Sequence, residues 1–197
     1  MAIKLTTRDL EVFKIISKVG SISRYMLEKD FNMERRTIYR YLKGDDPLLK
    51  VHNTPTKQGK KIVNRYTYSF TEKGAKIAIE LGYCRHVQGF NGYEHSLQAE
   101  RTIKELLEKG IDVSEILNEK EQEHRFREEI KAMENQDKVK NRKESSFAVC
   151  DFAYYDKDNQ LNIIEIETKN YRPRLRLQHK NYAKNLGAKY EVIRYRK

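Results

Sequence analysis

Apolar residues recur every three or four positions over much of the first part of the chain, which is the spacing of amphipathic helices. The first such segment, 7–19, begins with Thr7 as the predicted N-cap and ends at Gly20, a typical helix stop. The segments 21–31 and 32–44 repeat the pattern on a shorter scale. We therefore predict three short helices at the start of the chain.

The pattern changes to strand-like alternation after the third helix. The segment 48–51 is a short apolar run, 52–61 is polar with a proline and a glycine, and 62–70 alternates apolar and polar residues. A helical segment with a threonine cap, 71–82, follows. Three helices, a hairpin and a further helix predict a winged helix-turn-helix domain over residues 1–84.

The second half has a different organisation. Two glycines and a loss of periodicity predict a linker at 85–92, and 94–110 then shows the apolar stripe of a helix. The β-rich segments 146–155 and 161–168 flank the turn sequence DKDNQ, which predicts a hairpin, and a helix and a final strand follow. We expect an α+β chain whose second domain covers 93–197.

Charge and composition narrow the class of protein. Lys and Arg number 40 and Asp and Glu 29, and the net charge of +11 favours a polyanionic partner, most simply nucleic acid. No apolar run is long enough to span a membrane, and the N-terminus lacks the core of a signal peptide, so we expect a cytoplasmic protein. Cys84 and Cys150 form no sequence motif with each other or with histidine, so we expect reduced thiols and no structural zinc.

The third predicted helix carries basic residues on the side opposite Ile38. We expect Arg36 and Arg40 to reach the major groove of DNA, and the lysines of the predicted wing to contact phosphates. A helical protein-interaction domain with a solvated basic face is the alternative. The expected DNA-binding residues are Arg35, Arg36, Tyr39, Arg40, Lys43, Lys57, Lys60, Lys61 and Arg65.

Charged side chains share one face of the last β-rich segment, where Glu165, Glu167 and Lys169 alternate with isoleucines and a threonine. A solvated sheet face explains this alternation, and the pattern taken alone favours that interpretation. A metal-dependent phosphodiester site is the alternative, because Mg²⁺ binds one or two carboxylates together with phosphate oxygens. Lys169 would then stabilise charge on the phosphate or orient the attacking water.

Asp151 is the residue that favours a metal site. If Tyr155 opposes Leu161 across the hairpin, Asp151 lies on the carboxylate row of the next strand. In that register it faces Glu165, and a shift of two residues brings it opposite Glu167. Two carboxylates about 4 Å apart repel by roughly 4 kcal/mol at an effective dielectric of 20, and a divalent cation removes the conflict.

An acidic residue, a hairpin and the Glu-Thr-Lys sequence at 167–169 together resemble the PD-(D/E)xK nuclease superfamily. The resemblance implies that Asp151 and Glu167 hold Mg²⁺ or Mn²⁺ and that Lys169 supports the attacking water and the scissile phosphate. The helix before the hairpin resembles the first helix of archaeal-type Holliday junction resolvases. Their helix carries a metal-site glutamate, which corresponds to Glu100.

The two-domain layout resembles the replication-relaxation family of plasmids and mobile elements, and the related nuclease-fold relaxases of mobilisable plasmids. The C-terminal fifty residues carry most of the likeness, the winged helix matches only generically, and 111–146 hardly matches at all. Two departures stand out. Cys150 occupies the place of a proline that often precedes the aspartate, and Lys169 is retained although many members have a degraded site. The implied fold is a winged helix followed by a restriction-endonuclease-like α/β domain.

These features predict a metal-dependent DNA endonuclease of a plasmid, phage or other mobile element, which nicks or cleaves duplex DNA, is a homodimer and works with other DNA-processing proteins of the element. The alternative is a non-catalytic replication, mobilisation or transcription factor with a vestigial nuclease fold. A third possibility is transfer through a tyrosine, for which Tyr154, Tyr155 and Tyr171 lie near the predicted site. Gln178 is a candidate for a polar contact with the substrate.

Overall fold

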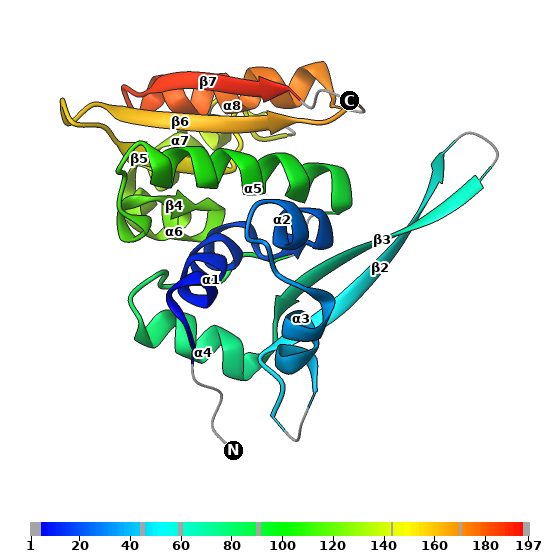
Figure 1. The fold of residues 1–197 in the computed structure, drawn as a ribbon. Coiled ribbons are helices and arrows are strands. Elements are labelled where there is room, and N and C mark those ends of the chain that lie inside the picture. Colours follow the sequence, from blue (N-terminus) through cyan, green and yellow to red (C-terminus); the bar gives the residue numbers. More distant parts are fainter. Residues whose placement is uncertain are drawn as a thin grey trace. The chain divides into compact units, whose positions relative to one another are not determined.

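The computed structural model describes residues 5–43, 46–58, 61–89, 92–142, 144–169 and 171–194. These residues form eight α-helices and two sheets, so the chain is a mixed α+β protein, as predicted (Figure 1). They divide into two compact units, Met1–Ser114 and Glu115–Lys197, which are described separately below. In the part of the chain that the structure describes, no helix is both long and apolar enough to cross a membrane.

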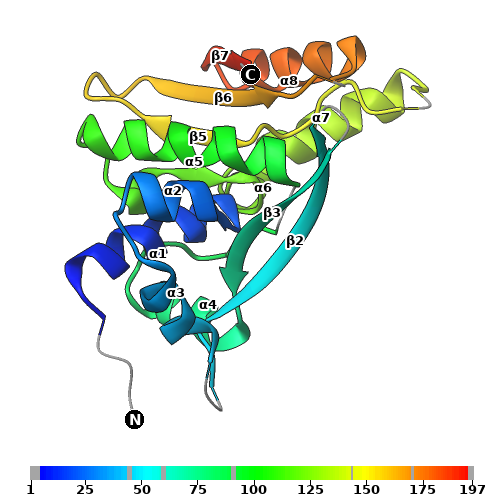
Figure 2. The same cartoon turned by 45° about the vertical axis from the view of Figure 1, so that its right-hand side comes forward.

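The first unit combines short helices with a long hairpin. Its sheet has the strand order β1-β3-β2, and β2 and β3 extend together away from the helices (Figures 1 and 2). The elements of this unit are α1 (Thr7–Val19), β1 (Ile22–Ser23), α2 (Arg24–Lys29), α3 (Arg35–Leu42), β2 (Leu49–Gln58), β3 (Lys61–Phe70), α4 (Glu72–Glu80) and α5 (Tyr93–Glu108).

Phe13 of α1 lies at the centre of the first unit's core. Its ring makes edge-to-face contacts with Phe70 of β3 and Tyr41 of α3, at centroid distances of 4.9 and 6.5 Å. Ile38 and Tyr41, three residues apart on α3, are both buried, as the helical spacing predicted. The same packing therefore turns the basic face of α3 outward.

Side-chain caps fix where the helices of this unit begin. Thr71 caps α4, as predicted, and Ser23 caps α2; each accepts a hydrogen bond from a backbone N–H three residues later. The predicted cap of the first helix was one residue too late. Thr6 is the N-cap of α1, and it forms a capping box with Asp9, whose carboxylate accepts from the Thr6 backbone N–H.

The hairpin is longer than the sequence pattern predicted. Strand β2 continues to Gln58, so most of the segment expected to be a polar loop pairs with β3. The prediction was wrong because neither face of this stretch is fully buried, which removes the apolar alternation. Pro55 is tolerated because β2 is an edge strand, where one side of the backbone needs no ladder partner.

The second unit contains a four-stranded sheet of order β4-β5-β6-β7. Strands β5 and β6 form the predicted antiparallel hairpin, with Tyr155 opposite Leu161, whereas β6 and β7 run parallel and are joined through α8. Its α- and β-elements are β4 (Leu117–Asn118), α6 (Glu119–Arg125), α7 (Arg127–Val139), β5 (Phe152–Tyr155), β6 (Leu161–Glu167), α8 (Pro173–Asn185) and β7 (Lys189–Arg194).

Helix α8 packs on the same face of β6 as the carboxylates. Ile163 of β6 shares one apolar cluster with Tyr182 and Ala183 of α8, and Phe126 and Met133 close the cluster from the α6–α7 region. Since successive side chains on a strand alternate between faces, Glu165 and Glu167 lie on the Ile163 side. The acidic row is thus carried into the interface with α8.

Candidate functional site

The acidic face of β6 is buried. Glu165 and Glu167 are 5% and 4% exposed, and every residue of the strand except Asn162 is buried. A solvated sheet face is therefore not the explanation for the alternating charges. Buried carboxylates require partners that offset their desolvation, so the contacts of each one define what the site does.

Glu167 is held by two arginines. Arg176 of α8 donates from Nε to Oε1 and from Nη2 to Oε2, the latter at 2.6 Å, and Arg194 at the end of β7 lies 3.4 Å from Oε2. The Arg176 guanidinium lowers the pKa of Glu167, against the opposing effect of burial. A bidentate pair of this kind is geometrically specific, so Glu167 stays ionised and fixes the first half of α8 to the strand.

Glu165 belongs to a separate cluster with Tyr171 and His179. The Tyr171 hydroxyl lies 2.7 Å from Glu165 Oε1 and hydrogen-bonds His179 Nδ1, which itself lies 3.1 Å from Oε1. Burial raises the pKa of Glu165, with Asp151 adding to the shift. Burial and the Glu165 charge also raise the pKa of Tyr171, which makes its hydroxyl a poor nucleophile at neutral pH.

Asp151 lies opposite Glu165, which is the first of the two registers that the sequence left open. Its backbone N–H donates to Glu165 Oε2 at 3.3 Å, and its own Oδ2 accepts from the Ile166 N–H at 2.8 Å. The structure therefore brings Asp151 next to Glu165, to which the resemblance assigned no role. Glu167, to which it assigned a metal, contacts arginines instead. Lys169 is exposed just beyond the end of β6.

Glu100 lies on α5, in the first unit, and is fully buried there. Its Oε2 accepts a hydrogen bond of 2.6 Å from Ser23, the N-cap of α2. Burial raises the pKa of Glu100 to about 8. Its assignment to a metal site with Asp151 and Glu167 stays a prediction, and the partner that the structure gives it is a hydroxyl group of its own unit.

The exposed face of α3 carries the predicted basic residues. Tyr39 is 41% exposed and lies between two cations, with Arg35 and Lys43 at 5.8 and 5.3 Å from its ring centroid. Arg36 is exposed on the same helix. Arg40 is exposed as well, but it also lies 3.2 Å from Asp9 of α1 and contacts the Tyr41 ring, so it anchors α3 to the unit.

The hairpin adds further positive charge. Lys57 and Lys61 are exposed on β2 and β3, whereas Arg65 is half-buried and lies 5.7 Å from the ring centroid of Tyr93. Lys60, also predicted to bind DNA, lies outside the described residues. From Arg35 to Arg65, both included, the sequence has nine Lys and Arg residues and two Asp residues.

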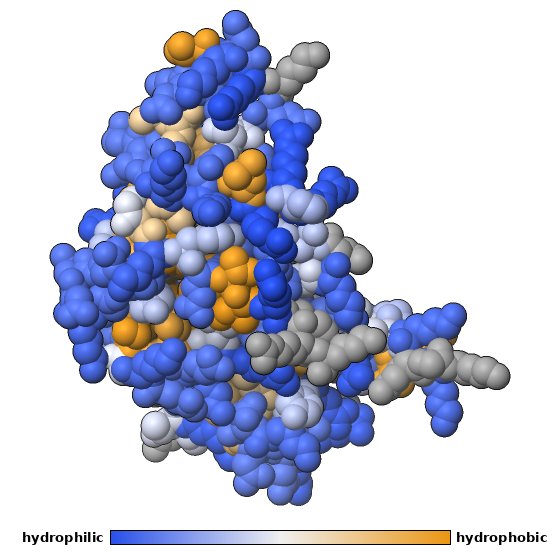
Figure 3. Space-filling view, turned by 90° about the horizontal axis from the view of Figure 1, so that it is seen from above, coloured by the Kyte–Doolittle hydropathy of each residue, from blue (hydrophilic) through white to orange (hydrophobic). Residues whose placement is uncertain are grey.

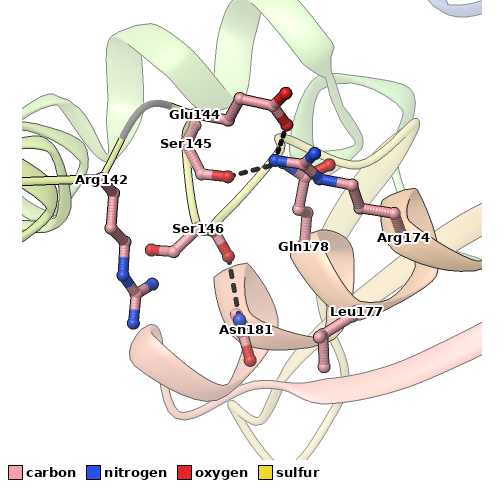
Figure 4. A pocket seen from close by; sticks show the side chains of 8 residues that line it. All are labelled: Arg142, Glu144, Ser145, Ser146, Arg174, Leu177, Gln178 and Asn181. Carbon is pink, nitrogen blue, oxygen red and sulfur yellow. Dashed lines mark hydrogen bonds and ion pairs between the residues drawn. The ribbon is translucent and has the colours of Figure 1, made fainter.

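A polar cleft of about 430 Å³ lies between α8 and the loop segment that contains Ser145 and Ser146 (Figure 4). Its polar groups bond one another: Gln178 and Asn181 donate to the backbone carbonyls of Ser145 and Ser146, and Arg174 pairs with Glu144. Gln178 is thus part of the contact between loop and helix.

The face shown in Figure 3 is mainly hydrophilic, with hydrophobic residues in small separate groups, so it suits water or a charged partner.

Sequence reasoning missed Arg176, His179 and Arg194. One signal was present: no acidic residue occurs between Thr168 and Tyr190, a stretch with seven Lys and Arg residues that follows directly on the two glutamates. Arg176 and His179 are three residues apart and so lie on one face of a helix. That spacing matches a pair of buried carboxylates on the neighbouring strand.

Comparisons with known proteins do not add a family to this description. No protein-family model matches the chain, and searches of curated proteins and of solved structures found no similar protein. The functional argument therefore depends on the geometry described above.

The buried position of Glu167 predicts unequal effects of two arginine substitutions on one helix. Arg176→Ala should lower the melting temperature by several degrees, because Glu167 is then left buried with the more distant Arg194. Arg174→Ala, which removes an exposed pair with Glu144, should change it little. Thermal unfolding of the two variants measures the difference, and equal losses would contradict the importance of burial.

The raised pKa of Glu100 predicts a specific pH dependence. Between its ordinary value of 4.5 and the folded value of about 8, the folded state holds a proton that the unfolded state has lost. The free energy of unfolding therefore falls as the pH rises through this range. Glu100→Gln removes the effect and should raise the melting temperature by several degrees at pH 9 but little at pH 4.5. Glu105→Gln, at an exposed site on the same helix, is the control.

Proposed function

We propose that this protein binds duplex DNA through its first unit, which acts as a winged helix-turn-helix module. The observation that carries the proposal is the exposed face of α3, where Arg35 and Lys43 flank the half-exposed ring of Tyr39 and Arg36 is also exposed. Cations with an aromatic ring between them suit a polyanion whose sugars and bases also offer apolar surface.

The arrangement around α3 supports this role. Ser23 caps α2 and Phe13 contacts Tyr41 of α3, so the helix that presents the cations is held by the core. The ten-residue strands β2 and β3 carry Lys57 and Lys61, which are suited to contact phosphates beside a helix in the groove. A recognition helix and a basic wing are the two contact elements that such a module requires.

Binding should depend on these particular cations rather than on net charge. The double substitution Arg36→Ala and Lys43→Ala should weaken binding at least about tenfold at fixed salt. It should also reduce the slope of log affinity against log salt by about one for each lost phosphate contact. Lys76→Ala with Lys109→Ala removes the same charge from exposed sites on α4 and the end of α5 and serves as the control. Fluorescence anisotropy with labelled duplex over a salt series measures both quantities, and equal loss in the two double variants would contradict the assignment.

Metal-dependent DNA cleavage is the second candidate function, and the specific observation that favours it is the juxtaposition of Asp151 and Glu165. Two neighbouring carboxylates at a strand end, followed by Lys169, would bind Mg²⁺ or Mn²⁺ and a phosphate. A role for Glu167 in holding the ion requires that the ion replace Arg176 and Arg194. The non-catalytic reading differs only in this second unit, so the two candidates share the DNA-binding step.

Cleavage is tested on supercoiled plasmid with Mg²⁺ or Mn²⁺. An active site predicts nicking that EDTA stops, and that Asp151→Asn and Lys169→Ala each abolish while DNA binding is retained. The double variant Lys76→Ala and Lys109→Ala should cut like the wild-type protein. A wild-type protein that is inert on supercoiled, linear, branched and single-stranded DNA, yet binds duplex, identifies a non-catalytic DNA-binding factor.

A further inference from the structure

A cluster of three different ligand types lies inside the second unit. Cys150 precedes β5, Glu165 is on β6 and His179 is on α8, and all three are buried. One potential ligand atom from each, a sulfur, an oxygen and a nitrogen, lies within 4.8 Å of the other two. These residues are 15 and 14 positions apart in the sequence, so only the packing of α8 on the hairpin brings them together.

Hydrogen bonds hold the residues that carry the ligand atoms in place. Glu165 Oε2 accepts from the Asp151 N–H at 3.3 Å, which leaves Oε1 facing His179 Nδ1 at 3.1 Å. The Cys150 carbonyl accepts from Gln122 Nε2 at 2.8 Å, which holds the backbone beneath the thiol. The Cys150 sulfur lies 3.9 Å from the His179 carbonyl, on the same side of α8. Such outer contacts resemble those that fix ligands around protein-bound metals.

We propose that Cys150, Glu165 and His179 form a binding site for a divalent transition metal of the zinc type. A thiolate, an imidazole and a carboxylate are ligands that Zn²⁺ accepts together, whereas Mg²⁺ favours oxygen ligands and several waters. Metal–ligand bonds of about 2.0–2.3 Å in a tetrahedron place ligand atoms about 3.3–3.7 Å apart. The Glu165–His179 separation is already close to that value, and the Cys150 sulfur, within 4.8 Å of the other two atoms, must approach by at most about 1.5 Å.

The charge of such a site suits its burial. A dication with one thiolate, one carboxylate and one neutral imidazole is neutral overall, so no net charge is left in the apolar interior. Binding releases the Cys150 thiol proton to solvent, together with any proton held by Glu165. The Tyr171 hydroxyl hydrogen-bonds both Glu165 and His179, so it lies next to two of the three ligands. Either this hydroxyl or a water completes the tetrahedron.

The site joins the start of β5, the middle of β6 and the middle of α8, so we assign it a stabilising role in the second unit. It uses neither Glu167 nor Lys169 but shares Glu165 with the candidate cleavage site, and it does not depend on DNA binding by the first unit. The alternative is that Tyr171, His179 and Glu165 satisfy one another by hydrogen bonds and that no metal enters.

Titration of the full-length protein with Co²⁺ in place of Zn²⁺ tests the site. The variant Cys84→Ser retains Cys150 as its single thiol, because the chain has two cysteines. We expect this variant and the wild-type protein to bind one Co²⁺ per chain, with the near-ultraviolet absorption of a cobalt–thiolate bond, and to lose that absorption when Zn²⁺ is added. Excess Zn²⁺ should also raise the melting temperature of both.

Cys150→Ser and His179→Gln should abolish the cobalt–thiolate absorption and the Zn²⁺-induced rise. If either variant fails to fold, the Cys84→Ser spectrum still decides, because Cys150 is then the sole source of a thiolate ligand. Absence of the absorption in Cys84→Ser, or displacement of Co²⁺ by equimolar Mg²⁺, would overturn the proposal. A wild-type protein that shows the cobalt spectrum but does not bind DNA would instead contradict only the function proposed for the first unit.

Discussion

Two carboxylates buried on one strand set the arrangement of the second unit. Glu165 and Glu167 are about 6.6 Å apart along β6, and α8 offers His179 and Arg176 with an axial rise of about 4.5 Å between them. The long side chain of Arg176 spans the difference between these two distances. The next turn of α8 enters the apolar cluster around Ile163. Sliding the helix by one turn would leave a buried carboxylate unpaired, so charge as well as apolar packing determines the register of α8.

The residues proposed to bind DNA and the acidic residues proposed for cleavage belong to different units. The cations that suit DNA are exposed in the first unit, whereas the acidic residues of the second are satisfied by the chain's own arginines, tyrosine and histidine. The proposed DNA binding therefore does not require any particular state of the acidic cluster. Cleavage would require the second unit to offer Asp151 and its neighbours to an ion and a phosphate at the end of β6.

Local features of this molecule were predictable from the sequence, and long-range pairings were not. The hairpin followed from a turn between two β-rich segments, with two registers left open, and the outward face of α3 followed from helical spacing. The partners of Glu167 and Glu100 come from residues 9 and 77 positions away, and periodicity carries no information about them. The same limit explains why the sequence did not connect Cys150 with Glu165 and His179, which share no motif with it along the chain. The extent of β2 was missed because a two-sided polar strand has no apolar face to reveal it.

The hydroxyl of Ser23 has two hydrogen-bond partners, one that donates to it and one that accepts from it. It accepts from the Met26 N–H to begin α2, and it donates to Glu100 on α5. The start of α2 is thereby tied to the charge state of a carboxyl group far away in the sequence. A protonated Glu100 can donate a hydrogen bond of its own, while an ionised one can only accept. The hydrogen bonding at the start of α2, the helix that precedes α3, is therefore linked to the protonation state of Glu100, whose side chain is fully buried.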